Sequence, residues 1–312
     1  MLEKECVIDS IEIRKAEIRD AEKLSKLYNE VWEGKYPLND FTEIEDVIRK
    51  IQENHFWYIA NLGDECIGSA VGTYDKENNT VEFGRAAVQK KYQKEGIAQK
   101  LYDIIKENSL EKNVDILWGL MRNKATFNIA KNYGFTVVGY SDYYILLGSR
   151  ETVLFGLNLT EQGKQKRVSS YMKDVYAINE VNKILRTMEL KDNDGKYPEE
   201  IMAQLKLKGK KISFSGVYFD PNKSLVIDSF FEKEKIPEYI EATILVDKTN
   251  HLRFLQSFGF SITSFLPGWY QKNDKRYDCI LLGKTLSEAS IKDDSLTEIV
   301  DYFKEEFKRG LE

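Results

Sequence analysis

Hydrophobic residues recur with two different spacings along the first half of the chain, and these spacings predict its helices and strands. Residues 9–16 alternate between apolar and polar side chains, as a strand does, whereas apolar residues three or four positions apart predict a helix over 18–33. Asp20 is the expected N-cap of this helix. The other elements expected here are a helix at 42–53, three strands between 56 and 88 with turns at 63–64 and 78–79, a helix from Gly96, a strand at 114–121, a helix from 124 that ends at Gly134, and strands at 136–146 and 151–159. This order predicts a mixed layer fold of the α+β class.

The second half of the chain has elements of its own. Residues 160–171 are polar and predict a linker or the frayed start of a helix. The elements expected after them are helices at 175–190 and 198–209, strands at 211–219, 224–231 and 242–247, and a C-terminal helix. We therefore expect two domains, residues 1–160 and residues 161–312.

An internal repeat links the two halves. The segments that begin at Asn123 and Asn250 each contain an asparagine, a short amphipathic helix, an aromatic-Gly-Phe stop and a long hairpin. Each hairpin carries an arginine, Arg150 or Arg276, just before its last apolar strand. The agreement in order and spacing over roughly 35 positions favours a repeat over two unrelated helix–glycine–strand units.

Composition narrows the class of protein. The chain has 312 residues, of which 42% are hydrophobic and 31% charged, as in ordinary soluble globular proteins. No apolar run is long enough for a membrane span, and the first residues lack a secretory signal, so we expect a cytoplasmic protein without a membrane partner. Three scattered cysteines indicate a reducing compartment, and two histidines argue against a His-rich metal site. A net charge of −5 disfavours nucleic acid as a partner.

The stretch Val81–Glu107 passes from a strand through a basic turn into a helix. Gly96 stands where the helix begins, and three lysines precede it: Lys90, Lys91 and Lys94. The N-terminus of a helix binds anions through its unpaired N–H groups, and a glycine lets the backbone approach a phosphate closely. The adjacent Glu95 would repel a phosphate unless it faces solvent. The segment thus predicts a site for a phosphate-bearing cofactor, with a simple strand–helix connection as the alternative.

With these features the first half resembles the GNAT superfamily of N-acetyltransferases. The signature of that family, Arg/Gln-x-x-Gly-x-Gly/Ala between its fourth strand and third helix, is matched here by residues 93–98. The strand before this turn, the helix after it, and the later segment from Asn123 to Gly134-Phe135 match in the same order. The resemblance covers about residues 10–160 and implies a mixed, mostly antiparallel central sheet flanked by helices.

The resemblance also implies acetyl-CoA as a co-substrate. In the family, the strand before the turn splays and its backbone pairs with the pantetheine arm of the cofactor, which assigns Ala86, Ala87 and Val88 to main-chain contacts. Asn123 is a further expected contact. The residues assigned to the phosphate turn are Gln93, Lys94, Glu95, Gly96, Ile97 and Ala98.

The implied reaction moves an acetyl group from acetyl-CoA to a primary amine by direct attack in a ternary complex. An amine with a pKa near 10.4 arrives protonated, so a base is needed, and Glu82 lies where many relatives carry one. The alternative for Glu82 is a solvated strand residue. The tyrosine that often protonates the leaving thiolate is replaced here by Ala130, and Tyr133, one turn further along the helix, is the candidate substitute. The alternative for Tyr133 is packing at the helix end.

The second half lacks the signature. Only the segment EKEKIPEYIE, residues 232–241, separates two expected strands there, which is too short for a phosphate turn followed by a full helix. We therefore expect a degenerate GNAT-like domain without a cofactor site, and one CoA per chain. Trp269, Tyr270 and Arg276 are expected to cover the acceptor site, to form a homodimer surface, or simply to pack.

The acceptor is expected to be a small-molecule amine or a peptide. The aromatic candidates for its site are Trp32, Tyr36, Tyr74, Tyr143 and Tyr144. The competing interpretations are an acyl-CoA-binding regulatory module or inactive acetyltransferase, and a nucleic-acid or protein scaffold that uses the basic turn. CoA release that depends on an amine separates the first two, and a strong salt dependence of duplex binding would support the third.

Overall fold

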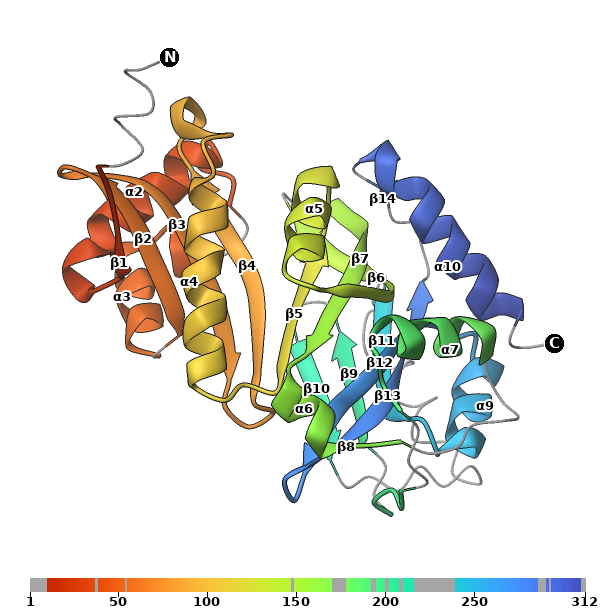
Figure 1. Ribbon diagram of the computed structural model, residues 1–312. Coiled ribbons are helices and arrows are strands. Elements are labelled where there is room, and N and C mark those ends of the chain that lie inside the picture. Colours follow the sequence, from red (N-terminus) through yellow and green to blue (C-terminus); the bar gives the residue numbers. More distant parts are fainter. Residues whose placement is uncertain are drawn as a thin grey trace. The chain divides into compact units, whose positions relative to one another are not determined.

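The strands predicted for the first half pair into a sheet in the computed structural model (Figure 1). Four antiparallel strands lie in the order β1–β2–β3–β4, and β4 pairs in parallel with the start of β5. The strands are β1 (Ile11–Lys15), β2 (Phe56–Leu62), β3 (Glu65–Asp75), β4 (Thr80–Val88) and β5 (Ile116–Met121). The prediction of a mixed, mostly antiparallel sheet is therefore confirmed.

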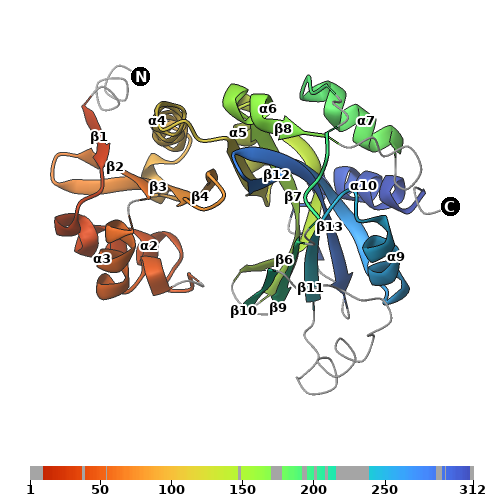
Figure 2. The same cartoon turned by 90° about the horizontal axis from the view of Figure 1, so that it is seen from below.

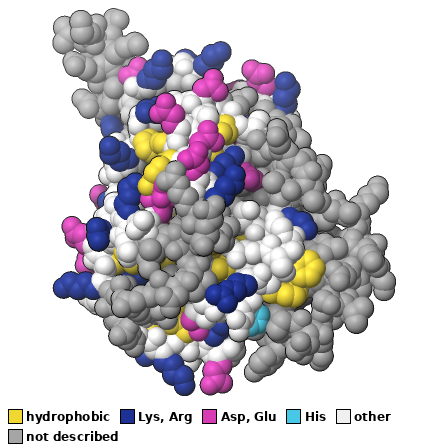
Figure 3. All heavy atoms as spheres, turned by 90° about the vertical axis from the view of Figure 1, so that its right-hand side faces the viewer, with side chains coloured by type: hydrophobic (Ala, Val, Ile, Leu, Met, Phe, Trp, Pro, Cys, Tyr) yellow, Lys and Arg dark blue, Asp and Glu magenta, His cyan; other side chains and the backbone are white. Residues whose placement is uncertain are grey.

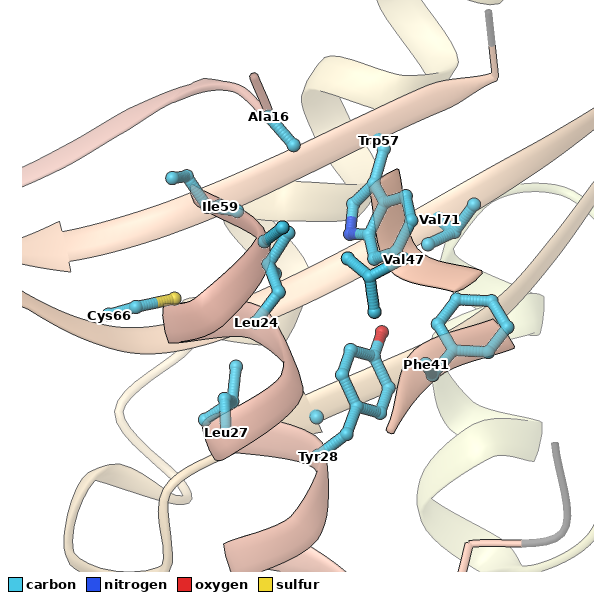
Figure 4. Packing of buried hydrophobic residues seen from close by; sticks show 12 residues of the cluster. Ala16, Leu24, Leu27, Tyr28, Phe41, Val47, Trp57, Ile59, Cys66 and Val71 are labelled. Carbon is cyan, nitrogen blue, oxygen red and sulfur yellow. The ribbon is translucent and has the colours of Figure 1, made fainter. Parts of the chain in front are cut away.

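The helices of this half cover both faces of the sheet (Figure 2). Helix α4 (Ile97–Glu111) packs on β2 and β3 from one face, and α2 (Ala21–Val31) and α3 (Ile44–Gln52) lie on the other. A core of buried side chains fills the layer between α2, α3 and the sheet (Figure 4). Its largest members are Leu24, Leu27, Tyr28, Phe41, Trp57 and Ile59. The apolar stripe predicted for 18–33 supplies three of them, because i, i+3 and i+4 positions share one helix face.

Two compact units divide the chain, and each is described by itself. The first comprises Met1–Gly119 with Ile145–Ser149, and the second comprises Leu120–Tyr144 with Arg150–Glu312. The structure describes residues 10–36, 39–53, 55–146, 149–169, 178–191, 195–199, 202–207, 210–215, 239–285, 290–291 and 293–309. The predicted domains, 1–160 and 161–312, follow the sequence repeat and stay a prediction.

The prediction that the Asp20 side chain caps helix α2 is wrong. Asp20 occupies the N-cap position of α2, but its carboxylate makes no cap hydrogen bond. Both of its oxygens instead accept hydrogen bonds from the guanidinium of Arg14 on β1, at 2.7 Å each, and one also accepts from the backbone N–H of Glu17 at 2.8 Å. Asp20 is 2% exposed, and a bidentate ion pair satisfies a buried carboxylate better than a single amide does.

The second unit contains a sheet in the order β7–β6–β12–β13–β11–β9–β10, with β14 beside β7 and β8 beside β13. Its strands are β6 (Thr136–Leu146), β7 (Ser149–Leu159), β8 (Arg167–Val168), β9 (Met202–Leu207), β10 (Lys210–Ser215), β11 (Tyr239–Leu245), β12 (Ser261–Lys272), β13 (Lys275–Thr285) and β14 (Ser290–Ile291). Its helices are α5 (Lys124–Asn132), α6 (Glu161–Lys166), α7 (Ile178–Thr187), α9 (Thr249–Ser257) and α10 (Thr297–Arg309). No helix within the described ranges is both long and apolar enough to cross a membrane.

The helix predicted at 198–209 is replaced by strand β9. The segment Met202–Leu207 pairs antiparallel with β10 on one side and with β11 on the other. Its sequence, MAQLKL, contains good helix formers, but Ala, Leu and Leu also alternate with the other residues at a period of two. Pairing on both sides therefore outweighs the local preference for a helix. The strand expected at 224–231 and most of the segment 232–241 lie outside the described residues.

The helix–hairpin repeat is confirmed in its local geometry. Helices α5 and α9 both end on an aromatic residue with φ −90° and ψ 8°, followed by glycines with φ 74° and 84°. Within the second unit, the two hairpins meet where Ser264 of β12 pairs antiparallel with Gly139 of β6, and these positions are equivalent in the repeat. Pairing of equivalent positions in antiparallel strands relates the two hairpins by a local two-fold axis. That the second half as a whole is a degenerate GNAT-like domain stays a prediction.

One part of the alignment on which the repeat was predicted needs correction. Asn123 is the N-cap of α5, whereas Asn250 lies inside the first turn of α9, whose N-cap is Lys248. The helix ends and glycines therefore align, and the two asparagines do not.

Candidate functional site

Strand β4 leaves its parallel neighbour halfway along its length. Pairing with β5 joins Thr80–Glu82 to Ile116–Trp118, and β4 continues to Val88 beyond the last of these pairs. On the other side, β3 pairs with β4 on both sides of a bulge, where Arg85 and Ala86 stand opposite a single residue of β3. This geometry leaves one backbone edge of the end of β4 for another partner, which is what the predicted contacts at Ala86, Ala87 and Val88 require.

The turn after β4 presents backbone amides at the start of α4. Lys94 and Gly96 both adopt left-handed conformations, with φ of 71° and 76°, and Gly96 is the N-cap. A glycine offers no side chain, so no side-chain hydrogen bond caps this helix, and a Cβ at Gly96 would meet nothing within 4 Å. The first-turn N–H groups, including those of Ile97 and Ala98, are thus available to an anion.

The turn carries positive charge, and the hollow beside it is lined by charged side chains of both signs. Lys90 and Lys94 form no ion pair with any other described residue, whereas Lys91 pairs with Glu65 at 3.0 Å. Gln93 donates from Nε2 to the carbonyl oxygen of Val88 at 3.1 Å, which ties the turn to the end of β4. A hollow of about 510 Å³ lies between the turn and the end of α2. It is lined by Glu30, Val31, Glu33, Gln89, Lys90, Lys91 and Gln93.

Glu82 lies next to an arginine. Its Oε2 is 3.1 Å from Nη1 of Arg85, and the two side chains are 21% and 23% exposed. The same Nη1 donates to Oγ1 of Thr73 at 2.9 Å. Burial favours loss of the Arg85 proton, but the Glu82 carboxylate outweighs it, so the pKa of Arg85 lies above its ordinary value. Glu82 is thus a half-buried carboxylate within reach of solvent, as a base must be.

The two remaining predicted site residues belong to the second unit. Asn123 caps α5: its Oδ1 accepts from the N–H of Thr126 at 3.0 Å, within a capping box. Tyr133 is 3% exposed at the end of the same helix, and its carbonyl accepts from Nδ2 of Asn158 at 3.0 Å. These contacts describe local structural roles, and the predicted cofactor and proton-transfer roles stay predictions.

The aromatic acceptor candidates divide into distinct groups. The rings of Trp32 and Tyr36 lie 5.3 Å apart, and Tyr36 also contacts Tyr28 at 5.4 Å. Tyr74 donates to Oδ1 of Asn79 at 3.2 Å and has Lys112 over its ring. The side chains of Tyr143 and Tyr144 lie outside the described residues.

In the late hairpin of the second unit, Arg276 and Trp269 make packing contacts, which is one of the roles expected for them. Arg276 is fully buried and donates to the carbonyl oxygens of Gly268 and Trp269, at 2.9 and 3.3 Å. The Trp269 ring packs edge-on against Phe155 at 5.6 Å. Arg276 therefore supports its own hairpin and is not a surface residue.

Sequence reasoning missed Arg85, Thr73 and Tyr28. The hydroxyl of Tyr28 donates a hydrogen bond to the carbonyl oxygen of Arg85, and burial raises the pKa of that hydroxyl. The one available signal was the pair Gly84-Arg85 inside an otherwise apolar strand, because an isolated glycine in a strand often marks a bulge.

The described surface and side-chain clusters show neither a metal site nor, in the view of Figure 3, a single-sign patch. No group of three or more His, Cys, Asp or Glu side chains that could hold a metal is found in the ranges the structure describes. On the face in Figure 3, basic and acidic side chains are interspersed.

Comparisons with known proteins match the first half of the chain. Residues 21–135 match the model of a family described as the acetyltransferase (GNAT) family, which confirms the resemblance and the fold class for this segment. The N-acetylaspartate synthetases of Rattus norvegicus and Homo sapiens are each 30% identical over 111 residues, 35% of this chain and 37% and 36% of theirs. The chain thus spans about a third of the length of these curated relatives. A solved structure of a putative acetyltransferase from Salmonella typhimurium with acetyl-CoA is 17% identical, has a TM-score of 0.42, and aligns with 48% of this chain and 93% of its own.

Proposed function

We propose that this chain, whose residues 21–135 belong to the acetyltransferase (GNAT) family, transfers an acetyl group from acetyl-CoA to a primary amine. The observation that carries the proposal is the course of β4 into α4. The strand leaves β5, bulges, and ends in a turn whose helix start has no side-chain cap. A free strand edge followed by free amides fits a ligand with an amide-bearing arm and a pyrophosphate.

The residues of this segment then have separate tasks. The backbone of Ala86–Val88 holds the pantetheine arm, and the amides from Gly96 to Ala98 hold the phosphates, with Lys90 and Lys94 adding positive charge nearby. Bound acetyl-CoA would supply the activated acetyl group as a thioester. Glu82 takes the proton that the amine must lose before it can attack. Direct attack requires mainly that the amine be held close to the acetyl carbon.

The candidate for a residue that protonates the leaving thiolate has less support than Glu82 has. Ala130, which is buried, stands where the family often has a tyrosine, and Tyr133 is 3% exposed. Because a thiol has a pKa near 8.5, release of a free thiolate at pH 7 costs only about 2 kcal/mol. Turnover therefore does not require a dedicated acid. The same substitution favours one second candidate, an acyl-CoA-binding regulatory module that has lost catalysis.

Acetyl-CoA and a panel of amines separate the two candidates. The acceptor is proposed to be a small-molecule amine or a peptide, and the name of the curated relatives makes amino acids the first class to include. The enzyme should release CoA thiol at a rate that depends on the amine, with an equal amount of acetylated product by mass spectrometry. A folded chain that binds CoA and releases no thiol with any amine would be the regulatory module.

A further inference from the structure

Arg85 holds a backbone conformation that arginine rarely adopts. Its φ is 52°, in the left-handed region, at the bulge where Arg85 and Ala86 stand opposite one residue of β3. Such a conformation costs about 1–3 kcal/mol in a non-glycine residue and persists where the surroundings enforce it. Here the fully buried Tyr28 anchors the Arg85 carbonyl through its hydroxyl, and the ring of Tyr28 packs against Phe41 at 5.0 Å (Figure 4). The bulge therefore carries an arginine whose backbone conformation is held by the surrounding core.

The guanidinium of Arg85 is only partly used by its neighbours. It lies 6.0 Å from the Phe41 ring, and its hydrogen bond to Thr73 and its ion pair with Glu82 both use Nη1. An arginine has five N–H donors, and within the described part of the chain Nη2 and Nε donate to no partner. The Arg85 side chain as a whole is 23% exposed, so part of it is open to solvent. Two parallel N–H groups match the two oxygens of a carboxylate.

The position of Arg85 along β4 decides which ligand it would meet. This step rests on the proposed function, in which the phosphates lie at the turn and the pantetheine arm runs back along Val88–Ala86. The acetyl end of the cofactor then lies at the bulge, next to Arg85 and a few residues from Glu82. An acceptor amine must come to this same place to react.

We propose that the acceptor is an amino acid or similar small zwitterion, whose carboxylate binds the guanidinium of Arg85 while its ammonium faces Glu82. The two protein charges are 3.1 Å apart, so a ligand with a carboxylate and an ammonium a few bonds apart matches them in sign and spacing. The ammonium loses one proton to Glu82, the free amine forms the C–N bond to the acetyl carbon, the nitrogen of this adduct releases its second proton to water, and the C–S bond breaks. The thiolate leaves with the electron pair of that bond and takes a proton from water.

Two roles for Arg85 make different predictions. If Arg85 only positions Glu82, its loss lowers kcat for every amine by a similar factor. If it binds the acceptor carboxylate, its loss raises KM for amino acids and leaves the KM of amines without a carboxylate nearly unchanged. The comparison that separates the roles is therefore between an amino acid and its own amide, which differ only at the carboxylate.

The experiment uses the full chain, acetyl-CoA, and a panel of amino acids paired with their amides, followed by thiol release. The wild type should prefer at least one amino acid over its amide by about 10–100-fold in kcat/KM, the size expected for a charge-assisted pair. Arg85→Gln should abolish this preference, and Arg85→Lys should keep part of it. Arg49→Gln, which removes an exposed arginine of α3 that pairs with Asp40 and Asp46, is the matched control and should keep the preference.

Calorimetry keeps the outcomes distinct. Arg85→Gln should bind CoA as the wild type does, and the CoA-loaded wild type should bind the N-acetylated form of the preferred amino acid, unlike Arg85→Gln. Equal use of acids and amides by the wild type, a preference that survives in Arg85→Gln, or no binding of any N-acetyl amino acid each overturns the inference while CoA binding remains. Absence of CoA binding by the wild type overturns the proposed function itself.

Discussion

The start of α4 offers a direct test of where a phosphate binds. Gly96 is exposed, has a φ of 76°, and has open space where a side chain would begin. Substitution by Glu or by Gln should cost about 1 kcal/mol of folding free energy in either case, because both residues must adopt the same left-handed backbone conformation. The two variants differ only in charge, so a comparison between them isolates the electrostatic contribution.

The expected size of the effect follows from the distance. A carboxylate at position 96 would lie about 5 Å from a phosphate at the helix start, and like charges at that distance repel by about 0.8 kcal/mol at the permittivity of water and about 3 kcal/mol at an effective value of 20. A pyrophosphate carries more than one charge, so Gly96→Glu should bind CoA about 10–100-fold more weakly than Gly96→Gln. The difference should shrink in 1 M salt, where the Debye length falls to about 3 Å. Calorimetric titration measures both affinities, and equal affinities in two folded variants would refute a phosphate site at this turn.

Four further predictions concern single side chains. Glu82→Gln should lower turnover about 100-fold near pH 7 and recover partly at high pH, where more amine is unprotonated; an unchanged pH–rate profile would make Glu82 structural. Asp20→Asn should lower the free energy of urea unfolding at pH 7 by about 2–3 kcal/mol, because it removes the carboxylate that pairs with Arg14. Burial alone would raise the pKa of Asp20, but the hydrogen bonds from Arg14 lower it overall. The stability that the ion pair contributes is therefore present above about pH 4 and is lost as the pH falls further. Burial lowers the pKa of His55, so the melting temperature should begin to fall as the pH drops below about 6.5, and His55→Gln should flatten that part of the profile. Gly139→Ala should destabilise the second unit by about 3 kcal/mol in thermal unfolding, since its Cβ would lie 2.1 Å from a carbonyl oxygen of β12, and a stability equal to wild type would contradict the pairing of the two hairpins.

The sequence predicted the elements whose signals are local. The turns at 63–64 and 78–79 separated β2, β3 and β4, and Gly96 marked the start of α4. The predicted helix at 198–209 failed because its composition favours a helix while its partners on both sides impose a strand. A preference of a few tenths of a kcal/mol per residue is readily outweighed by such pairing.

The site was predicted at its backbone and missed at its side chains. The turn of residues 93–98 has a signature because glycine is required at a fixed place. Arg85 has none, because its conformation depends on the hydroxyl of Tyr28, 57 positions away in the sequence, and its charge is matched by Glu82 only once the bulge has formed. Asp20 was likewise predicted as a cap because its partner, Arg14, lies on a different element and its hydrogen bonds to the carboxylate have no local signal in the sequence.

A crystal structure of the full chain with CoA is the measurement that tests the central claim most directly. We predict one CoA per chain, with its phosphates on the backbone amides from Gly96 to Ala98 and its pantetheine arm along Ala86–Val88, ending at the bulge that carries Arg85. A CoA bound elsewhere on the chain, or a turn left empty at saturating CoA, would contradict the account.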